Sequence, residues 1–180
     1  MTSFYSEEEL KSLGLKSYGN NILISRKCSI YSPTKITIGN NVRIDDFCIL
    51  SGNITLGSNI HISAFCALYG AEGIILEDYT GMSPRSIIFS AMDDFGGDYL
   101  IGPIHPEQFT NVRGGVVKLE KFSQLGANTI VFPNVTIKKG AVTGAFSLVN
   151  QTLDEWTINT GIPINKSWPR SKGIIAKVSE

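Results

Sequence analysis

One short stretch of the chain gathers the groups most able to hold or move a proton: Asp93, Asp94, Tyr99 and His105. An imidazole is half-ionised near neutral pH, whereas a carboxylate in water has a pKa near ~4 and is a weak base unless burial or a like charge raises that pKa. Such a set suits the binding and deprotonation of a polyol. We expect His105 to be the general base and Asp93 or Asp94 to orient its ring, although the two aspartates could instead cap the first turn of the loop.

The second histidine, His61, comes directly before Ile62 of the aliphatic repeat described below, so its side chain should point outward. Two interpretations stay open for it: an alternative general base, or a hydrogen-bonded histidine at a subunit interface. Catalytic zinc takes three protein ligands, commonly histidines, and this chain has only two histidines. We therefore predict no metal site and regard a zinc-dependent hydratase as a poor fit.

An aliphatic residue recurs every six positions on both sides of the stretch that holds these side chains. Of the seventeen positions in this repeat, sixteen are Ile, Leu, Val or Met: Ile24, Ile30, Ile38, Ile44, Leu50, Leu56, Ile62, Leu68, Leu76, Met82, Ile88, Leu119, Leu125, Val131, Ile137, Thr143 and Val149. A period of six fits neither an α-helix nor a simple hairpin. It is typical of hexapeptide repeats, which predict an all-β, parallel β-helix of about seven coils.

A second position, four residues after each aliphatic one, is also small or apolar. It holds Thr34 and all three cysteines, Cys28, Cys48 and Cys66. Because alternate residues of a strand share a face, we predict that these side chains point inward and that Cys66 stacks on Cys48. The thiols should be buried core filling that is dispensable for chemistry. Cysteines without pairing or metal-ligand spacing fit a reducing compartment.

The repeat organises the 180 residues into one predicted domain. We expect an N-terminal cap over residues 1–20, coils over 21–90, an excursion loop over 91–117, coils over 118–150 and a tail over 151–180. Ser6 and Glu9 have capping-box spacing, which predicts a short helix in the cap. Lys plus Arg and Asp plus Glu both number 16, which argues against nucleic acid as a partner. Without a long apolar run we predict no membrane insertion and a cytoplasmic location.

Three late segments resemble a known family: the run from Leu125 to Ile137, the run from Gly144 to Val149, and Gly161-Ile162-Pro163. With the six-residue repeat, they make the chain similar to the hexapeptide-repeat acyltransferases over roughly residues 20–170. Within that family it resembles small sugar O-acetyltransferases of the galactoside and surface-polysaccharide type. The resemblance implies a left-handed β-helix, a homotrimer, acetyl-CoA as donor, and active sites in the clefts between neighbouring subunits.

The resemblance also implies a place for the donor. The pantetheine arm would pass small residues of the late coils, and cations of the tail would meet the nucleotide phosphates; the matching residues are Gly126, Ala127, Gly144, Ala145, Lys166 and Arg170. Alternatively, Gly and Ala stand at these corners because tight corners tolerate little else. One departure is plain: the resembled enzymes carry a histidine where the excursion loop begins, and this chain reads Met92-Asp93-Asp94-Phe95 there.

These observations predict an acetyl-CoA-dependent O-acetyltransferase that acts on a sugar, free or carried on a nucleotide or lipid, in the biosynthesis of a surface polysaccharide such as O-antigen or capsule. One alternative is an N-acetyltransferase for a nucleotide-linked amino sugar, which needs a general base less because a neutral amine is already nucleophilic. A second alternative is a catalytically inactive trimeric scaffold, which the missing loop histidine favours.

Overall fold

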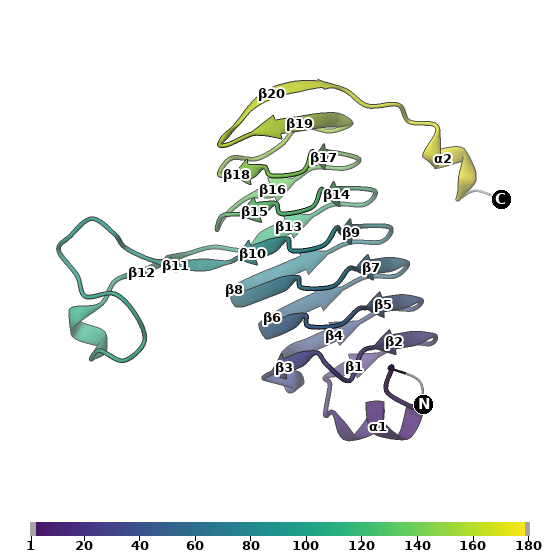
Figure 1. The fold of residues 1–180 in the computed structure, drawn as a ribbon, viewed down its shortest axis with the longest axis horizontal. Coiled ribbons are helices and arrows are strands. Elements are labelled where there is room, and N and C mark those ends of the chain that lie inside the picture. Colours follow the sequence, from purple (N-terminus) through teal and green to yellow (C-terminus); the bar gives the residue numbers. More distant parts are fainter. Residues whose placement is uncertain (1–2, 179–180) are drawn as a thin grey trace.

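The computed structural model describes residues 3–178 as a solenoid of short parallel strands with about seven turns (Figure 1). Helical structure in that range is confined to two short α-helices, α1 (Glu7–Ser12) and α2 (Ile174–Lys177), and two 3-10 turns, η1 (Pro33–Lys35) and η2 (Glu107–Phe109). The predicted all-β, parallel β-helix is confirmed.

Three stacks of parallel strands form the faces of the solenoid. The first face contains β3 (Ser29–Tyr31), the start of β6 (Ile49–Leu56), the start of β8 (Ala67–Leu76), β10 (Ile87–Phe89), β15 (Ile130–Val131) and β18 (Leu148–Val149). The second contains β1 (Ser17–Tyr18), β4 (Ile36–Ile38), the ends of β6 and β8, β13 (Val117–Leu119) and β16 (Thr136–Ile137). The third contains β2 (Ile22–Ile24), β5 (Val42–Ile44), β7 (Ile60–Ile62), β9 (Gly81–Met82), β14 (Gln124–Leu125), β17 (Val142–Thr143) and β19 (Thr157–Gly161).

The repeat positions fill the interior of the solenoid. All seventeen except Ile30 are buried, and Leu68 is 0 % exposed between Leu50 and Ile88 of the neighbouring coils. The second inward position is buried at Cys48 and Cys66 but only half-buried at Cys28. The prediction for Thr34 is wrong, because η1 adds two residues between Ile30 and Ile38 and leaves Thr34 exposed.

A long excursion leaves the solenoid where the first face turns into the second. We call residues 91–114 the arm; it contains η2 and the antiparallel pair β11 (Ala91–Asp93) and β12 (Val112–Gly114). The same corner also carries the two-residue insertion at η1, so added residues gather along one edge. Figure 1 shows the arm projecting on the left, away from the edge at which β5, β7 and β9 are labelled.

The two ends of the solenoid are covered in different ways. At the first coil, the backbone N–H of Ser6 donates to Glu9 (2.6 Å) and the N–H of Glu9 donates to Ser6 Oγ (3.3 Å), which confirms the predicted capping box of α1. At the last coil, β20 (Ile164–Pro169) pairs antiparallel with β19, and α2 follows β20. No helix within residues 3–178 is long and apolar enough to cross a membrane.

Candidate active site

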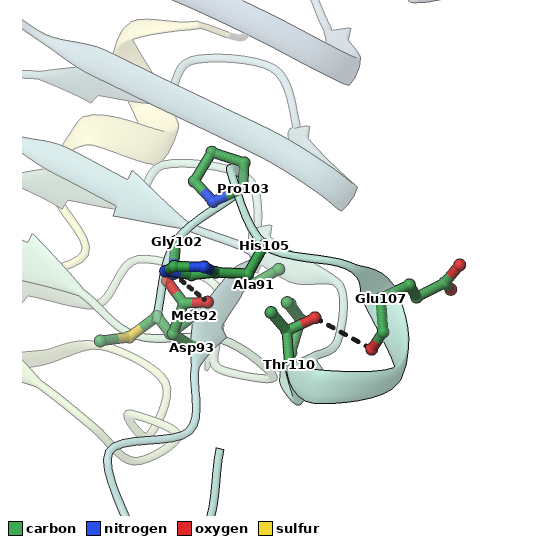
Figure 2. A pocket seen from close by; sticks show the side chains of 9 residues that line it. Ala91, Met92, Asp93, Gly102, Pro103, His105, Glu107 and Thr110 are labelled. Atoms are coloured by element: carbon green, nitrogen blue, oxygen red, sulfur yellow. Dashed lines mark hydrogen bonds between the residues drawn. The ribbon is translucent and has the colours of Figure 1, made fainter. Parts of the chain in front are cut away.

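The arm encloses a cleft of about 360 Å³, which we call the arm cleft (Figure 2). Its lining combines acidic, basic and apolar groups: Ala91, Met92, Asp93, Gly102, Pro103, His105, Glu107, Thr110 and Val112. The backbone N–H of Gly102 donates to Asp93 Oδ1 at 3.3 Å, and no other side chain or N–H in residues 3–178 donates to Asp93. Asp93 and His105 thus share one cleft without a hydrogen bond between them, and most of the Asp93 carboxylate is left for a ligand.

Unlike Asp93, Asp94 has hydrogen-bond or ion-pair partners at both of its carboxylate oxygens. Its Oδ1 accepts the backbone N–H of Gly96 (2.9 Å), and its Oδ2 accepts Asn111 Nδ2 (2.8 Å) and Arg113 Nη2 (2.6 Å). The Gly96 N–H, with Asn111 and Arg113, holds the pKa of Asp94 below its usual range against the opposing effect of burial. Asp94 is therefore an ionised group that closes the Asp94–Gly96 turn, as the loop-capping alternative predicted.

A second cleft, of about 410 Å³, lies between the arm and the late coils, and we call it the root cleft. Aromatic, carboxamide and charged side chains line it: Met92, Asp93, Asp94, Phe95, Arg113, Gly114, Phe132, Pro133, Asn134 and Asn150. Met92 and Asp93 line both clefts, so the two clefts meet at the end of β11.

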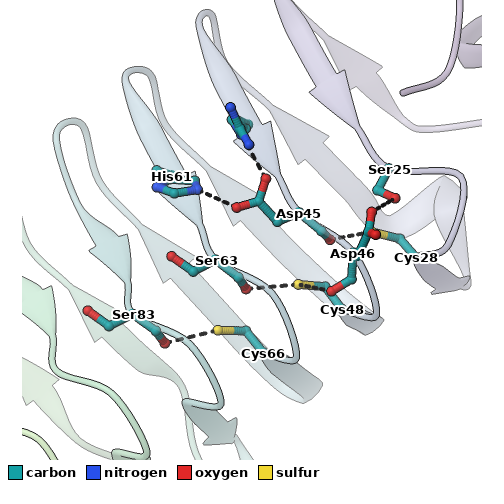
Figure 3. Close-up of polar contacts among 10 residues, drawn as sticks. Ser25, Cys28, Asp45, Asp46, Cys48, His61, Ser63, Cys66 and Ser83 are labelled. Carbon is teal, nitrogen blue, oxygen red and sulfur yellow. Dashed lines mark hydrogen bonds and ion pairs between the residues drawn. The ribbon is translucent and has the colours of Figure 1, made fainter. Parts of the chain in front are cut away.

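His61 lies outside the arm, on β7 of the third face, and its side chain points outward as predicted, with 55 % exposure. Its Nε2 donates to Asp45 Oδ2 at 2.7 Å, and Asp45 Oδ1 accepts Arg43 Nε at 2.7 Å (Figure 3). Burial acts to raise the pKa of Asp45, but the hydrogen bonds from His61 and Arg43 outweigh it and hold that pKa below its usual range. No group of three or more His, Cys, Asp or Glu side chains within residues 3–178 is placed to hold a metal ion.

The structure therefore divides the predicted catalytic residues into two groups. Asp93, Asp94 and His105 lie in or beside the arm, which leaves the corner between the first and second faces. His61 lies on the third face, which is the face opposite that corner. One chain does not bring His61 to the arm.

Four of the predicted donor residues, Gly126, Ala127, Gly144 and Ala145, stack at the corner between the third and first faces, which we call the donor corner. Ser63 and Ser83 occupy the same corner in earlier coils. A Cβ on Gly126 would lie 2.6 Å from the carbonyl carbon of Gly144, and one on Gly144 would lie 2.5 Å from Thr160 Cγ2. The glycines are thus required by the packing of consecutive coils. Ala145 is exposed, and the other members of the set, Ala127 included, are half-buried.

The two predicted cations of the tail, Lys166 and Arg170, differ in whether their side chains are already engaged by the protein. Arg170 Nη1 donates to the carbonyls of Phe122 and Gly140, both at 2.8 Å, and its guanidinium lies 6.0 Å from the centre of the Trp156 ring. Burial lowers the pKa of this guanidinium. Arg170 therefore fastens the tail to the solenoid, whereas Lys166 on β20 is exposed.

Sequence reasoning missed a column of hydrogen-bond donors inside the donor corner. Cys48 Sγ donates to the carbonyl of Ser63 (3.1 Å), Cys66 Sγ to that of Ser83 (3.2 Å), and Ser86 Oγ to that of Gly126 (2.9 Å). These two thiols and the Ser86 hydroxyl each satisfy a corner carbonyl of the next coil. Figure 3 shows the two thiol contacts. The signal was present in the sequence: in every third six-residue repeat, which is once per coil, the second inward position is Cys, Ser or Thr.

No family model matches the chain, but comparison with known proteins finds similar enzymes. It is 38 % identical over 176 residues to dTDP-4-amino-4,6-dideoxy-D-glucose acyltransferase of Escherichia coli, covering 96 % of this chain and 92 % of that protein. Its fold matches AntD, an N-acyltransferase from Bacillus cereus solved with dTDP and 3-hydroxybutyryl-CoA, with a TM-score of 0.97, 50 % identity, and coverage of 99 % and 96 %. A single-residue variant of AntD was solved with dTDP-4-amino-4,6-dideoxyglucose and coenzyme A.

A more distant neighbour has the same fold. A hexapeptide-repeat acetyltransferase of Vibrio cholerae matches with a TM-score of 0.63 and 16 % identity over 89 % of this chain and 75 % of that one. The nearer relatives act on amino sugars, so they favour the predicted alternative of N-acylation over O-acetylation, and they speak against an inactive scaffold. By its identity to a characterised enzyme along nearly all of its length and by its coiled fold, the chain belongs to the hexapeptide-repeat acyltransferases.

Proposed function

We propose that this acyltransferase moves an acyl group from acyl-CoA to the amino group of a nucleotide-linked amino sugar, with a dTDP-linked 4-amino-4,6-dideoxyhexose as the first acceptor to test. The support is twofold. The relatives act on such acceptors over matched lengths of chain. The arm also presents Asp93 to an open cleft with a single backbone N–H as its partner.

The free Asp93 carboxylate is the observation that carries the proposal. A carboxylate accepts hydrogen bonds and holds an ammonium or amine by charge, so it fits an amino group better than a hydroxyl group. A hydroxyl acceptor needs a positioned general base, worth typically ~10²–10⁴-fold. His105, the expected base, has no partner in the arm cleft to fix its ring, so the arm suits an amine that is nucleophilic once neutral.

The donor is acyl-CoA, and we place its pantetheine along the donor corner, beside Ala127 and Ala145. Gly126 and Gly144 keep this part of the corner shallow. Lys166 is available to a phosphate, whereas the Nη1 of Arg170 is already used by two carbonyls. The acyl group is acetyl in our expectation, and 3-hydroxybutyryl, the group on the donor found with AntD, is the alternative to compare.

The working form is a homotrimer in this proposal. Phe47 and Phe65 stack with ring centres 5.0 Å apart while 49 % and 52 % exposed, and Tyr69 stacks on Phe89 at 5.3 Å on the first face. Burying such surface against another copy stabilises an assembly by about 25 cal/mol per Å² of apolar area. The cytoplasm, where acyl-CoA is made and thiols stay reduced, is the proposed location, and surface-polysaccharide biosynthesis the proposed use.

The test compares acceptors that differ in one group. Release of free CoA thiol is followed with acetyl-CoA or 3-hydroxybutyryl-CoA and three acceptors: the dTDP-linked 4-amino sugar, its 4-hydroxyl counterpart, and the free amino sugar. We expect turnover with the nucleotide-linked amine and little with the other two. Turnover of the 4-hydroxyl sugar at an equal rate would contradict the proposal, as would a lack of turnover with every amine.

A further inference from the structure

Among the carboxylates of residues 3–178, Asp45 is hydrogen-bonded to His61, and none is hydrogen-bonded to His105. Asp45 holds Nε2 at 2.7 Å and is itself held by Arg43, while the imidazole is 55 % exposed. An ionised carboxylate accepts hydrogen bonds but does not donate them, so the proton of the neutral ring lies on Nε2 and the lone pair on Nδ1. Figure 3 shows the second ring nitrogen pointing away from Asp45, where it is open to accept a proton.

The surroundings of this pair contain few other charges. Arg43 and Asp45 come from β5 and the corner that follows it, and β9 on the other side places Gly81 beside His61. The Arg43 side chain is engaged with Asp45 Oδ1 and lies 5.3 Å from the Phe4 ring. No carboxylate other than Asp45 is hydrogen-bonded to His61 within residues 3–178.

The pair also lies close to the donor corner. β7 runs directly into Ser63, whose N–H donates to the carbonyl of Met82, and the N–H of Ser83 donates to the carbonyl of Leu125. Ser63, Ser83 and Gly126 therefore follow one another up the corner, and at ~4.8 Å per coil Gly126 is about 10 Å above the level of Ser63. His61 is thus next to the lower part of the surface on which we place the donor.

We propose that His61 and Asp45 form the proton-accepting pair of the reaction and act on an amine that the arm of a second copy holds at Asp93. The second copy is required because the arm leaves the corner opposite the third face, so that the arm and β7 of one chain lie on different sides of the solenoid (Figure 1). The inference rests on the proposed N-acylation and assigns its base.

The chemistry balances as follows. The acceptor arrives as an ammonium, whose proton passes to Nδ1 of His61, and Asp45 stabilises the imidazolium that forms. The neutral amine attacks the thioester carbonyl, a C–N bond forms and the C–S bond breaks. The nitrogen then loses its second proton to the departing thiolate, which leaves as CoA thiol, and His61 returns its proton to water.

The test measures kcat/KM for the amino-sugar acceptor against pH in wild type, His61→Gln and Asp45→Asn. We expect His61→Gln to lose about 100-fold near neutral pH, because a base contributes ~10²–10⁴-fold. The loss should shrink as the pH rises and the amine becomes neutral in solution, while KM for acyl-CoA stays unchanged. Imidazole in the buffer should restore part of the activity of His61→Ala. Leu23→Gln, two strands below on the same face and 37 % exposed, is the matched control and should behave as wild type.

Mixed oligomers test the contribution of two copies. His61→Ala and Asp93→Asn are refolded together in equal amounts. Random mixing leaves about a quarter of the sites with both wild-type residues, so roughly that share of wild-type turnover should return. Full activity of His61→Gln near neutral pH would overturn the inference, as would a loss that is the same at every pH or a mixture with no regained turnover. If wild type acylates no amine at all, the proposed function itself fails, which is a distinguishable result.

Discussion

The solenoid and the arm hold their residues in place by different means. In the solenoid, each inward residue is fixed by its equivalents in the coils before and after it, as Leu68 is by Leu50 and Ile88. In the arm no such equivalents exist, and local hydrogen bonds such as those to Asp94 set the shape. A repeat therefore provides stability through many interchangeable contacts, and the chemistry depends on the few positions that do not repeat.

A truncation in the core should produce the largest effect on stability. Leu68→Ala removes a fully buried side chain from the middle of a stack, and we expect it to lower the free energy of unfolding by about 2–5 kcal/mol. Turnover per folded molecule should stay near wild type, since the arm is untouched. Thermal and denaturant unfolding measure the free energy of unfolding. An acyl-transfer assay, scaled to the concentration of folded protein, measures turnover. A loss of turnover at unchanged stability would contradict the division between solenoid and arm.

The converse change lies in the arm. Asp93→Asn keeps the shape and removes the charge that we propose holds the amine, so turnover should fall about 100-fold, equivalent to about 2.7 kcal/mol of transition-state stabilisation. The melting temperature should not change, because Asp93 has one hydrogen bond, from the Gly102 N–H. Near-normal turnover in a correctly folded Asp93→Asn protein would remove Asp93 from the reaction.

Arg113 offers a finer change within the arm. Arg113→Gln removes one of the donors that lower the pKa of Asp94 and loosens the turn, so KM for the acceptor should rise about ten-fold, since small displacements of binding groups are costly. Because the folded pKa of Asp94 is depressed, its contribution to stability is present above its unfolded pKa of ~4 and is lost as the pH falls through the folded value.

The fall of the unfolding free energy at acid pH measures the contribution of Asp94 to stability. A titration of unfolding free energy below pH 5 should have a smaller slope in Arg113→Gln than in wild type, and Arg113→Lys should fall between the two because it keeps the charge. An Arg113→Gln protein with the wild-type slope at acid pH and the wild-type KM would show that the ion pair does not hold Asp94 in place.

The cysteine column predicts the smallest effects. Cys66→Ala leaves the carbonyl of Ser83 without its donor and opens a small cavity, which should cost ~1–2 kcal/mol. Cys66→Ser keeps a donor, as Ser86 does one coil later, and should cost less than about 1 kcal/mol. Both variants should retain turnover. Equal destabilisation by Ala and Ser would mean that the thiol only fills space.

The sequence predicted the solenoid because a six-residue period repeats the same physical demand at every turn. It placed Ile30 and Thr34 less well, because the insertion at η1 shifts the phase locally. The interior hydrogen bonds of Cys48 and Cys66 depend on the next coil, which a search for apolar residues does not see.

The site was harder to predict than the fold. The arm residues were found as chemical groups, but the different roles of Asp93 and Asp94 depend on Gly96, Asn111 and Arg113, whose contacts follow no repeat. The role of Arg170 was also not predictable from the sequence. The basic tail suggested that Arg170 binds a phosphate, but its Nη1 donates to the carbonyls of two residues that are distant in the sequence. The pairing of His61 with Asp45 joins neighbouring coils and becomes visible only when the coils are stacked.

The most direct test of the account identifies the bond that the enzyme forms. A dTDP-linked 4-amino sugar labelled with ¹⁵N at the amino group is incubated with the protein and acyl-CoA, and the product is examined by proton–nitrogen correlation NMR. The account predicts a new amide N–H signal from the labelled nitrogen, with one CoA thiol released per amide formed. Release of CoA without that signal, accompanied by an ester that hydroxylamine cleaves, would contradict it.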